Sequence, residues 1–559
     1  MSTVASKSNR DAPVNRTNRT VLIILLLLVL LIAAIFLSYR NAAQAARDEY
    51  FMDGEIILVG TTTELDALIQ ELQTIDDNII LTIDPNRSFS LQDLGSPAEQ
   101  TLGPQTVASA ALQIGSGSAA CSQLSSDLEI NLYELTGSTD DVEAVLEAID
   151  QTTAGSSVLA DANWVIGAPW HPTGSPWHPT GSPWHPTGSD VDQGKPTPAT
   201  MDDYLEQWAF STIGLVDAQA VNTGSELARI RVGVFDTSPL ESNGPAAASV
   251  QESPTQNALK VQIDHPEFIN TPVPPEEGSR QDINVANHGY FGTSFIRQLA
   301  PASEIELIRV LTKNNRGDLA TLNHELLTFM GQANQNGIMT VVNMSLGVPP
   351  LEPFRPFEPW LDWEFPPPFE LVRQLNSLET VMQIGECLDV VMVAAAGNDS
   401  AESLKVSNYP GHWGTVLSVT ASNQDNQQSC YANDGDLAAP GGDGGPSDPK
   451  AEEPIACEPK LHECVNLGPN CPYSVIGYVH PSTLQSTEAA VTHHNWVGTS
   501  FAAPMVTGLA ALVRQLNPGL SAAEVRDVIQ CGTVKPTTPQ EVPVINVART
   551  LACARDLNN

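Results

Sequence analysis

Four apolar runs of strand length constrain the fold more than any other feature of the sequence. They are RIRVGVFD (229–236), EIELIRVL (304–311), IMTVVNMSL (338–346) and LDVVMVAAAG (388–397), and helical spacing of apolar residues is found at 319–337 and 370–385. Strands that are apolar almost throughout are buried on both faces, and intervening helices are the connections that parallel strands require. The region 201–559 is therefore predicted to be an α/β domain around a mostly parallel sheet.

A smaller α+β unit is predicted at residues 50–166. EIILVG (55–60) and IILTI (79–83) read as strands around a helix at about 62–73, which Thr61 and Glu64 open with a capping box. The pattern recurs as a strand at 128–135, a helix within 139–150 and a strand at 157–165. Two such βαβ halves indicate a ferredoxin-like domain, with a loop over about 84–120 between them.

The N-terminal residues predict a membrane segment. Residues 21–37 are uninterrupted and apolar, and at about 1.5 Å per residue they span a bilayer's hydrocarbon core. Basic residues precede this run, which places the N-terminus in the cytoplasm. The prediction is a cytoplasmic tail (1–19), a transmembrane helix or signal anchor (20–38), and an extracytoplasmic remainder. The alternative is a cleaved signal peptide and a secreted protein, although signal peptides usually have apolar regions of about 7–15 residues.

PWHPTGS occurs three times in tandem at 169–189, within a segment predicted to link the two domains (167–200). Two prolines in seven residues exclude a helix or an inner strand, so an extended linker is expected. The alternative is a weak metal or ligand site built from His171, His178 and His185. A spacing of seven in an extended chain disfavours it, because the imidazoles would lie far apart.

Charge and cysteine content narrow the partners and the compartment. The net charge of −39, from 65 acidic and 26 basic residues, argues against nucleic acid as a partner. Eight cysteines in an exported chain are consistent with disulfides. Cys457, Cys464 and Cys471 are expected to staple one loop-like stretch; a zinc site there is the alternative, but no C-x-x-C pair is present. Cys387 is expected to be a plain core residue.

Three residues have the chemistry of a nucleophilic site. Asp236 ends an apolar strand, where α/β sheets place their sites, and His288 begins an apolar helical segment as a candidate general base. His265 competes for that role, but Pro266 follows it in a predicted turn. Ser500 lies among small residues at the start of a helix, where free N–H groups favour developing negative charge. A serine nucleophile needs a base and an orienting acid, and these residues supply all three.

The motifs around these residues resemble those of subtilisin-like serine peptidases (subtilases, peptidase family S8). GTSFAAP (498–504) resembles the serine motif, GVFDTS (233–238) the aspartate motif and NHGYFGTSFIRQLAP (287–301) the histidine motif. DLAAPGG (436–442) matches the segment before the serine motif, and the order Asp, His, Ser is that of the family. The resemblance covers about 205–550 and implies a subtilisin-like three-layer fold. It also implies an Asp236, His288, Ser500 triad that hydrolyses peptide bonds through an acyl-enzyme.

The resemblance assigns further residues. Asn398 in VAAAGND (393–399) corresponds to the side-chain donor of the oxyanion hole, with the backbone N–H of Ser500 as the second donor. Such a donor is worth about 3 kcal/mol, a magnitude measured in a family member. The substrate-binding residues implied are Ser345, Leu346, Gly347, Ala395, Ala396 and Gly397. No cofactor is required, and structural calcium is consistent with the family, but no metal ligands are assigned.

The sequence departs from the family pattern at several positions. Ser238 replaces a usual glycine, and Tyr290 and Phe291 follow the histidine where small residues are usual, which is expected to reshape the cleft near the non-primed pockets. The insertion at 349–369 is rich in proline and aromatics and is either a wall for peptide side chains or a lid packed on the protein itself. A second insertion (443–494) brings His493 and His494 near Ser500 in sequence, but the motif order favours His288.

The domain at 50–166 resembles the inhibitory propeptide of the same family, and ADANWV (160–165) resembles its last strand. This implies an intramolecular partner that assists folding and blocks the cleft until it is cut. Polypeptide substrates are the other expected partners, besides the membrane. The alternative function is a catalytically degenerate scaffold or binding protein. An esterase with an α/β-hydrolase fold is disfavoured, because position 502 is alanine where G-x-S-x-G needs glycine, and because the triad order differs.

Overall fold

The computed structural model of the chain describes residues 51–92, 124–136, 141–167, 197–215, 228–238, 260–262, 287–312, 316–335, 337–348, 375–400, 406–445, 457–459, 463–464, 467–479, 493–538 and 541–557. All of them belong to one compact unit, formed by Tyr50–Leu351 and Leu371–Asn559. The predicted tail and membrane segment, the PWHPTGS repeats, the 349–369 insertion and His265 lie outside the described residues. Within the described ranges, no helix has the length and apolarity needed to cross a bilayer.

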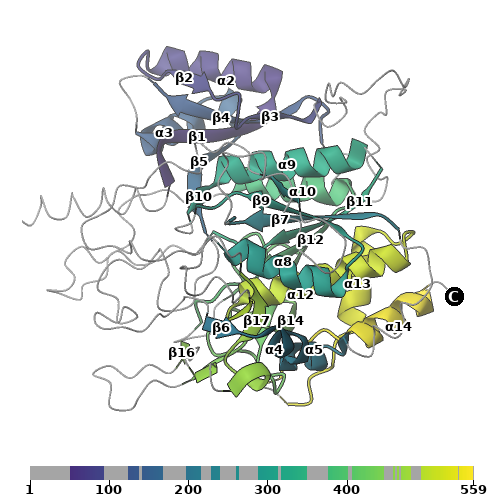
Figure 1. The fold of residues 1–559 in the computed structure, drawn as a ribbon. Coiled ribbons are helices and arrows are strands. Elements are labelled where there is room, and N and C mark those ends of the chain that lie inside the picture. The colour runs from purple at the N-terminus through teal and green to yellow at the C-terminus, as the bar shows by residue number, and fades with distance from the viewer. Residues whose placement is uncertain are drawn as a thin grey trace, which may run out of the picture. The chain divides into compact units, whose positions relative to one another are not determined.

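A seven-stranded sheet forms the centre of the peptidase-like region (Figure 1). Every neighbouring pair of its strands is parallel. The prediction of a parallel α/β domain is therefore confirmed. In spatial order the strands are β14 (Leu437–Pro440), β13 (Val416–Ser422), β12 (Val391–Ala395), β11 (Met339–Met344), β7 (Ile230–Asp236), β9 (Glu304–Arg309) and β8 (Lys260–Gln262).

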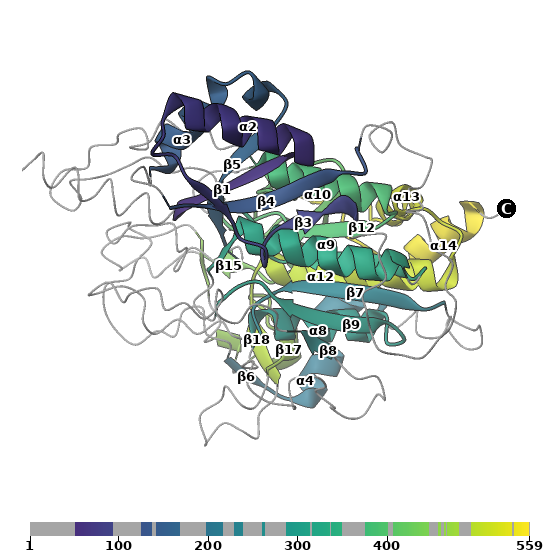
Figure 2. The same cartoon turned by 90° about the horizontal axis from the view of Figure 1, so that it is seen from above.

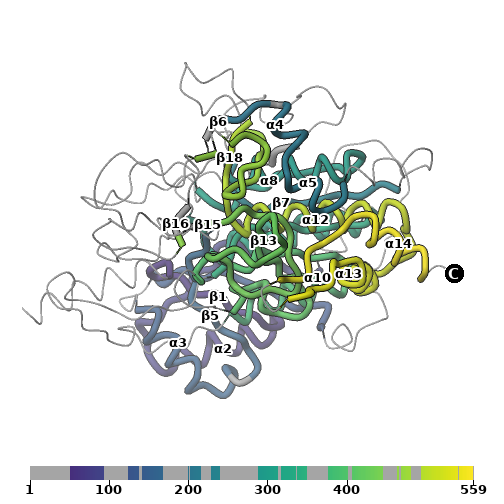
Figure 3. Tube along the Cα trace, turned by 90° about the horizontal axis from the view of Figure 1, so that it is seen from below, coloured from purple at the N-terminus to yellow at the C-terminus, as the bar shows by residue number. Residues whose placement is uncertain are grey.

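Helices lie on both sides of this sheet (Figure 1). On one side α12 (Thr499–Leu516) packs against strands β11 to β14 and against α8 (His288–Leu299). On the other side are α9 (Leu319–Gln335) and α10 (Asn376–Cys387). Nearly every residue of α12 is buried, because its alanines and Gly508 allow neighbouring elements to approach closely. At the C-terminal end, α13 (Ala522–Cys531) packs on α14 (Val547–Leu557), as Figure 3 shows.

The N-terminal domain contains an antiparallel sheet in the order β5-β1-β4-β2, with strands β1 (Phe51–Thr61), β2 (Leu81–Ile83), β4 (Leu128–Leu135) and β5 (Leu159–Ile166). Helices α2 (Thr62–Ile75) and α3 (Val142–Asp150) pack on it, as Figure 2 shows for α2. The capping box of Thr61 and Glu64 forms as predicted. In the region predicted as a loop, β3 (Phe89–Ser90) pairs with β4.

The N-terminal domain docks onto the helices α9 and α10. Strands β1 and β5 contact α10, β5 contacts α9, and β10 (Gly317–Asp318) extends the N-terminal sheet by pairing with β5. Asp161 of β5 caps α10 from outside, because its carboxylate accepts the backbone N–H groups of Asn376 (3.1 Å) and Ser377 (2.7 Å). Asn163 accepts the N–H of Ala320 in the first turn of α9 (2.9 Å). The domain thus satisfies the free N–H groups of two helices.

A small sheet of β17 (Val475–Tyr478), β18 (His493–Trp496) and β6 (Thr197–Ala199) lies in the peptidase-like region. The short helices α4 (Met201–Glu206) and α5 (Trp208–Thr212) follow β6. Between them, Gln207 exchanges two hydrogen bonds with the backbone of Ile476. The remaining short elements are β15 (Gly444–Gly445), β16 (Glu458–Pro459), η3 (Ala154–Ser156) and η4 (Gly468–Asn470).

Disulfides correct two of the sequence predictions. Cys464 bonds to Cys471, which staples the loop-like stretch as expected, but Cys457 bonds to Cys430 instead, so the zinc alternative is wrong. Cys531 bonds to Cys553 and joins α13 to α14. Cys387 is also disulfide-bonded, so its prediction as a plain core residue is wrong. An apolar flank cannot distinguish a buried thiol from a buried disulfide, because both are apolar.

Candidate active site

Asp236 and His288 meet where β7 ends and α8 begins. The Nδ1 atom of His288 lies 2.8 Å from Oδ1 and 3.0 Å from Oδ2 of Asp236, and both side chains are buried. The backbone N–H of Thr237 also donates to Asp236 Oδ1 (2.6 Å), which fixes the carboxylate. Because a carboxylate only accepts, Nδ1 of a neutral His288 carries the proton and Nε2 keeps a free lone pair. The imidazole is therefore held in the tautomer of a general base.

Gly289 allows this contact. A Cβ atom at position 289 would lie 2.5 Å from the carbonyl oxygen of Thr237 and 2.6 Å from Cβ of Asp236. Its N–H donates to Oγ1 of Thr237 (3.3 Å). Any larger residue would push the start of α8 away from β7.

Ser500 occupies the first turn of α12, as the small residues around it predict. Its Oγ atom is buried and makes no hydrogen bond with any residue that the structure describes. Its carbonyl oxygen accepts a hydrogen bond from Oγ of Ser345 (2.7 Å), and that hydroxyl accepts one from Asn343 (3.0 Å). Thr507 of α12 donates to the amide oxygen of Asn343 (2.9 Å). This buried chain fixes α12 against β11, and sequence reasoning missed Asn343 and Thr507.

The side chain of Asn398 is oriented by Thr499 through its amide oxygen. The side-chain oxygen accepts from the N–H (3.1 Å) and the hydroxyl (2.8 Å) of Thr499. Thr499 Oγ1 in turn accepts the N–H of Gly397 (3.3 Å). The amide nitrogen consequently lies beside Gly498, two residues from Ser500. This is the arrangement that an oxyanion-hole donor needs, because its orientation is set before any ligand binds.

Aromatic rings enclose the imidazole of His288. Its ring centroid lies 5.6 Å from Trp496 and 5.1 Å from Phe501, and both aromatic side chains are buried. Phe291 packs on Trp496 and Phe501 and is fully buried. Tyr290 is buried as well, so these two residues contribute to the interior beneath the site and not to an open cleft. Trp496 was not identified from the sequence as part of the site.

The predicted substrate-binding residues are occupied by the protein's own chain. Gly347 exchanges two backbone hydrogen bonds with Gly167, which follows β5, at 2.8 and 3.1 Å. An antiparallel pairing of this kind is how an edge strand binds an extended peptide. Ala396 forms backbone hydrogen bonds with Val419 and Asn408, and the carbonyl oxygen of Gly397 accepts from Asn433. The other three members, Ser345, Leu346 and Ala395, are buried in the fold.

Metal ligands are not indicated among the residues that the structure covers. Within these ranges, no group of three or more His, Cys, Asp or Glu residues has the arrangement of a metal site. The expectation of structural calcium stays a prediction.

Comparison with known proteins agrees with the geometry. Residues 283–540 match the model of the subtilase family. This part of the chain therefore has the sequence of a subtilisin-like serine peptidase. It is 28% identical over 265 residues to subtilisin BL of Lederbergia lenta, covering 45% of this chain and 71% of that protein. It is also 28% identical over 254 residues to the serine protease AprX of Bacillus subtilis, covering 45% of this chain and 51% of the relative.

Two solved structures are also similar to this chain. A lanthipeptide protease matches with a TM-score of 0.41 at 19% identity, covering 66% of this chain and all of that one. The nisin leader peptidase NisP from Lactococcus lactis matches with a TM-score of 0.42 at 16% identity, covering 63% of this chain and 95% of its own. The family match and the curated relatives support a serine-type endopeptidase, a hydrolase. The family match includes His288, Asn398 and Ser500 but not Asp236, whose place rests on its contact with His288.

Proposed function

We propose that this peptidase cleaves peptide bonds with Asp236, His288 and Ser500 through an acyl-enzyme intermediate. Ser500 Oγ attacks the scissile carbonyl carbon while Nε2 of His288 takes the hydroxyl proton. The oxyanion accepts hydrogen bonds from the amide of Asn398 and the backbone N–H of Ser500. His288 then gives its proton to the leaving amine, and water releases the acyl group by the same route. The observation that carries the proposal is the buried contact of His288 Nδ1 with Asp236.

The N-terminal domain is proposed to be an intramolecular propeptide with a ferredoxin-like fold. In support, its strand order β5-β1-β4-β2 and its two helices follow the βαββαβ pattern. Its last strand leads to Gly167, which pairs with Gly347 as an extended substrate would. The domain also caps α9 and α10 through Asn163 and Asp161. We therefore expect it to support folding of the peptidase domain and to block the cleft until it is cut.

The peptidase domain is proposed to act outside the cytoplasm. Three disulfides join described cysteines, and such bonds persist in oxidising compartments. The apolar run at 21–37 supports a single membrane anchor, with secretion after signal cleavage as the alternative.

A catalytically degenerate scaffold is the second candidate. The observation that favours it is the absence of any hydrogen bond from Ser500 Oγ to a described group. Catalytic hydrogen bonds are often long or poorly aligned without substrate, so this geometry alone does not decide.

A fluorophosphonate probe separates the two candidates. The full-length chain is first treated by limited proteolysis, which removes its N-terminal domain. The probe should then label Ser500, because an activated serine attacks the phosphorus. The Ser500→Ala variant should not be labelled. Ser345→Ala is a poor control because Ser345 supports Ser500, so Ser211→Ala, at an exposed position of α5, serves instead. Absence of labelling in the wild type, with correct folding, would establish the scaffold.

Replacing Asn398 by alanine is expected to lower kcat by about 10²–10³-fold with little change in KM. The variant loses the donor that meets the oxyanion, whereas the ground-state substrate has little charge there. The comparison variant is Asn423→Ala, because Asn423 bonds only to surface-loop groups such as Asp443. A fall in kcat below tenfold for Asn398→Ala would mean that another donor carries this role.

A further inference from the structure

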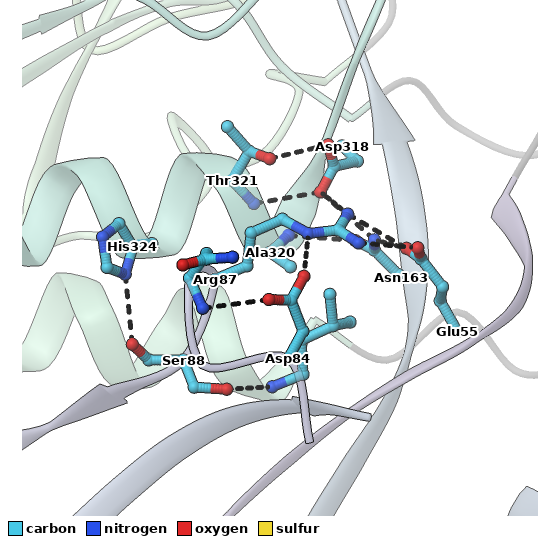
Figure 4. Close-up of polar contacts among 11 residues, drawn as sticks. Glu55, Asp84, Arg87, Ser88, Asn163, Asp318, Ala320, Thr321 and His324 are labelled. Atoms are coloured by element: carbon cyan, nitrogen blue, oxygen red, sulfur yellow. Dashed lines mark hydrogen bonds and ion pairs between the residues drawn. The ribbon is translucent and has the colours of Figure 1, made fainter. Parts of the chain in front are cut away.

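A buried charge cluster lies where the N-terminal domain contacts the start of α9 (Figure 4). At its centre is Arg87, which is 4% exposed. Its guanidinium pairs with Glu55 (2.8 Å) and Asp84 (2.8 Å) of the same domain. It also lies 3.6 Å from Asp318, which belongs to the peptidase domain. Docking therefore brings a third carboxylate to a site that contains one cation.

The charges in this cluster do not balance. Among the described residues Arg87 is the only cation paired with Glu55, Asp84 and Asp318, so full ionisation leaves two uncompensated negative charges. Asn163 donates to both Glu55 and Asp318 (3.1 Å to the latter), which relieves part of the cost. Uncompensated buried charge costs several kcal/mol per ion, and a carboxyl group avoids that cost by taking up a proton.

The other ionisable groups nearby do not supply the missing charge. His324 of α9 donates from Nδ1 to the carbonyl oxygen of Ser88 (3.1 Å) and meets the ring of Phe89 edge to face. Glu134 stands opposite Glu55 in the β1–β4 register and adds further negative charge. On β5, Asp161 faces the amides of α10. Protonation of His324 in acid would add positive charge to this surface, in the same direction as protonation of the carboxyl groups.

Glu55 and Asp84 differ in how firmly they keep their charge. Burial raises the pKa of Glu55, the charge of Asp318 raises it further, and hydrogen bonds from Arg87 only partly oppose this. Burial acts in the same sense on Asp84, but hydrogen bonds from Arg87 and the backbone N–H of Asn86 hold its pKa below the usual value. Asp84 thus stays ionised and paired with Arg87. Glu55 and Asp318 both lie beside the same guanidinium and share its single positive charge.

We propose that docking of the N-terminal domain, which brings Asp318 beside Glu55, takes up a proton at Glu55, so that the domain binds more tightly in acid and is released as the pH rises. The inference rests on the proposed propeptide role of this domain. A group whose pKa is higher in the docked state favours docking below its free pKa, and this contribution is lost as the pH rises through the docked pKa. One proton linked in this way changes the undocking constant by about tenfold per pH unit between those two pKa values.

Amide hydrogen exchange of the full-length Ser500→Ala chain tests the linkage without any cleavage. The N–H of Ala320 reports docking, because it bonds to Asn163 of the N-terminal domain. After correction for intrinsic exchange, its opening constant should rise at least tenfold between about pH 5 and pH 8. Amides inside the central sheet, such as that of Val393, should show no such rise. An equal opening constant of Ala320 at both pH values would overturn the proposal.

Asp161 is a second carboxyl group that could make docking depend on pH. Burial raises its pKa to about 6, although hydrogen bonds from Ser377 and Asn376 act in the opposite direction. Its contribution to docking has the same sign, so variants of the cluster are compared in an Asp161→Asn background. There, Glu55→Gln should reduce the pH-dependent rise at Ala320 to below about threefold. Asp318→Asn should reduce the rise to the same extent. This variant leaves the N-terminal domain unaltered, so it tests the proposal even if Glu55→Gln fails to fold. Retention of the full rise in both variants would contradict the proposal.

Glu304→Gln is the matched control, because Glu304 forms an exposed ion pair with Arg229 and should leave Ala320 exchange unchanged at each pH. In the cut wild-type protein, the N-terminal fragment should co-elute with the peptidase domain near pH 5 and separate near pH 8. Co-elution at both values would contradict the proposed release. The exchange experiment requires no peptidase activity, so a wild type that fails to react with fluorophosphonate would refute the proposed function and leave the proton linkage still testable.

Discussion

Replacing His288 by alanine is expected to lower kcat by about 10⁶-fold, and adding Ser500→Ala should cause no comparable further loss. The hydroxyl of Ser500 is a weak nucleophile without a base, and His288 has no proton to accept without the hydroxyl. The two residues therefore act as one unit, and residual activity in either variant would come from substrate binding and the oxyanion donors.

The measurement is kcat on a chromogenic peptide for both single variants and the double variant, after removal of the N-terminal domain. His412→Ala is the control, because His412 is exposed and packs on Tyr409 away from the triad. Its kcat should stay within about twofold of wild type, since surface substitutions change little. A double variant whose loss equals the product of the two single losses would show that His288 does not activate Ser500.

The elements that carry Asp236, His288 and Ser500 could be predicted from the sequence. The residues that hold these side chains in place could not. Each of the three lies in a local motif at the end of an apolar strand or the start of a helix, and those elements formed near the predicted bounds. The supporting contacts join distant parts of the chain. Asn343 and Thr507 are separated by 164 positions, and nothing local to either residue indicates the other.

Short or paired features were the hardest to predict. Strands β3 and β10 have two residues each, too few for any alternation of apolar and polar residues. Disulfide pairing is not contained in cysteine spacing, since eight cysteines allow 105 pairings. Phe291 was misplaced for a related reason. A bulky residue next to a catalytic motif suggests a side chain that lines the cleft. Phe291 instead packs on Trp496 and Phe501, which belong to two elements distant from it in sequence.

The N-terminal domain illustrates the same limit at a larger scale. Its helices and most of its strands follow from periodicity, because each buries one apolar face. The charge cluster around Arg87 does not, because Asp318 lies more than two hundred positions away. An Arg near an Asp in sequence usually indicates a solvated pair of little energetic consequence. Only the docked structure reveals that this pair is buried with two further carboxylates.

Replacing Asp236 by asparagine is expected to lower kcat by about 10⁴-fold while KM changes little. The backbone N–H of Thr237 donates to Oδ1 of Asp236, so the new amide should keep its oxygen there and place its NH₂ at the position of Oδ2. That nitrogen would lie about 3.0 Å from Nδ1 of His288, where two N–H donors cannot face each other. The imidazole then either moves its proton to Nε2, which removes the lone pair that Ser500 needs, or keeps Oδ1 as a neutral acceptor (2.8 Å) that no longer stabilises the imidazolium.

The control for this change is Asp389→Asn, which alters the ion pair with Arg514 and should affect stability more than kcat. Purified variants are compared by kcat and KM, with their fold checked by thermal unfolding. Asp236 lies outside the residues that match the family model, so this experiment tests the one member of the triad that the family match does not cover. A kcat within tenfold of wild type would mean that another group orients His288, and that the Asp236 contact is structural.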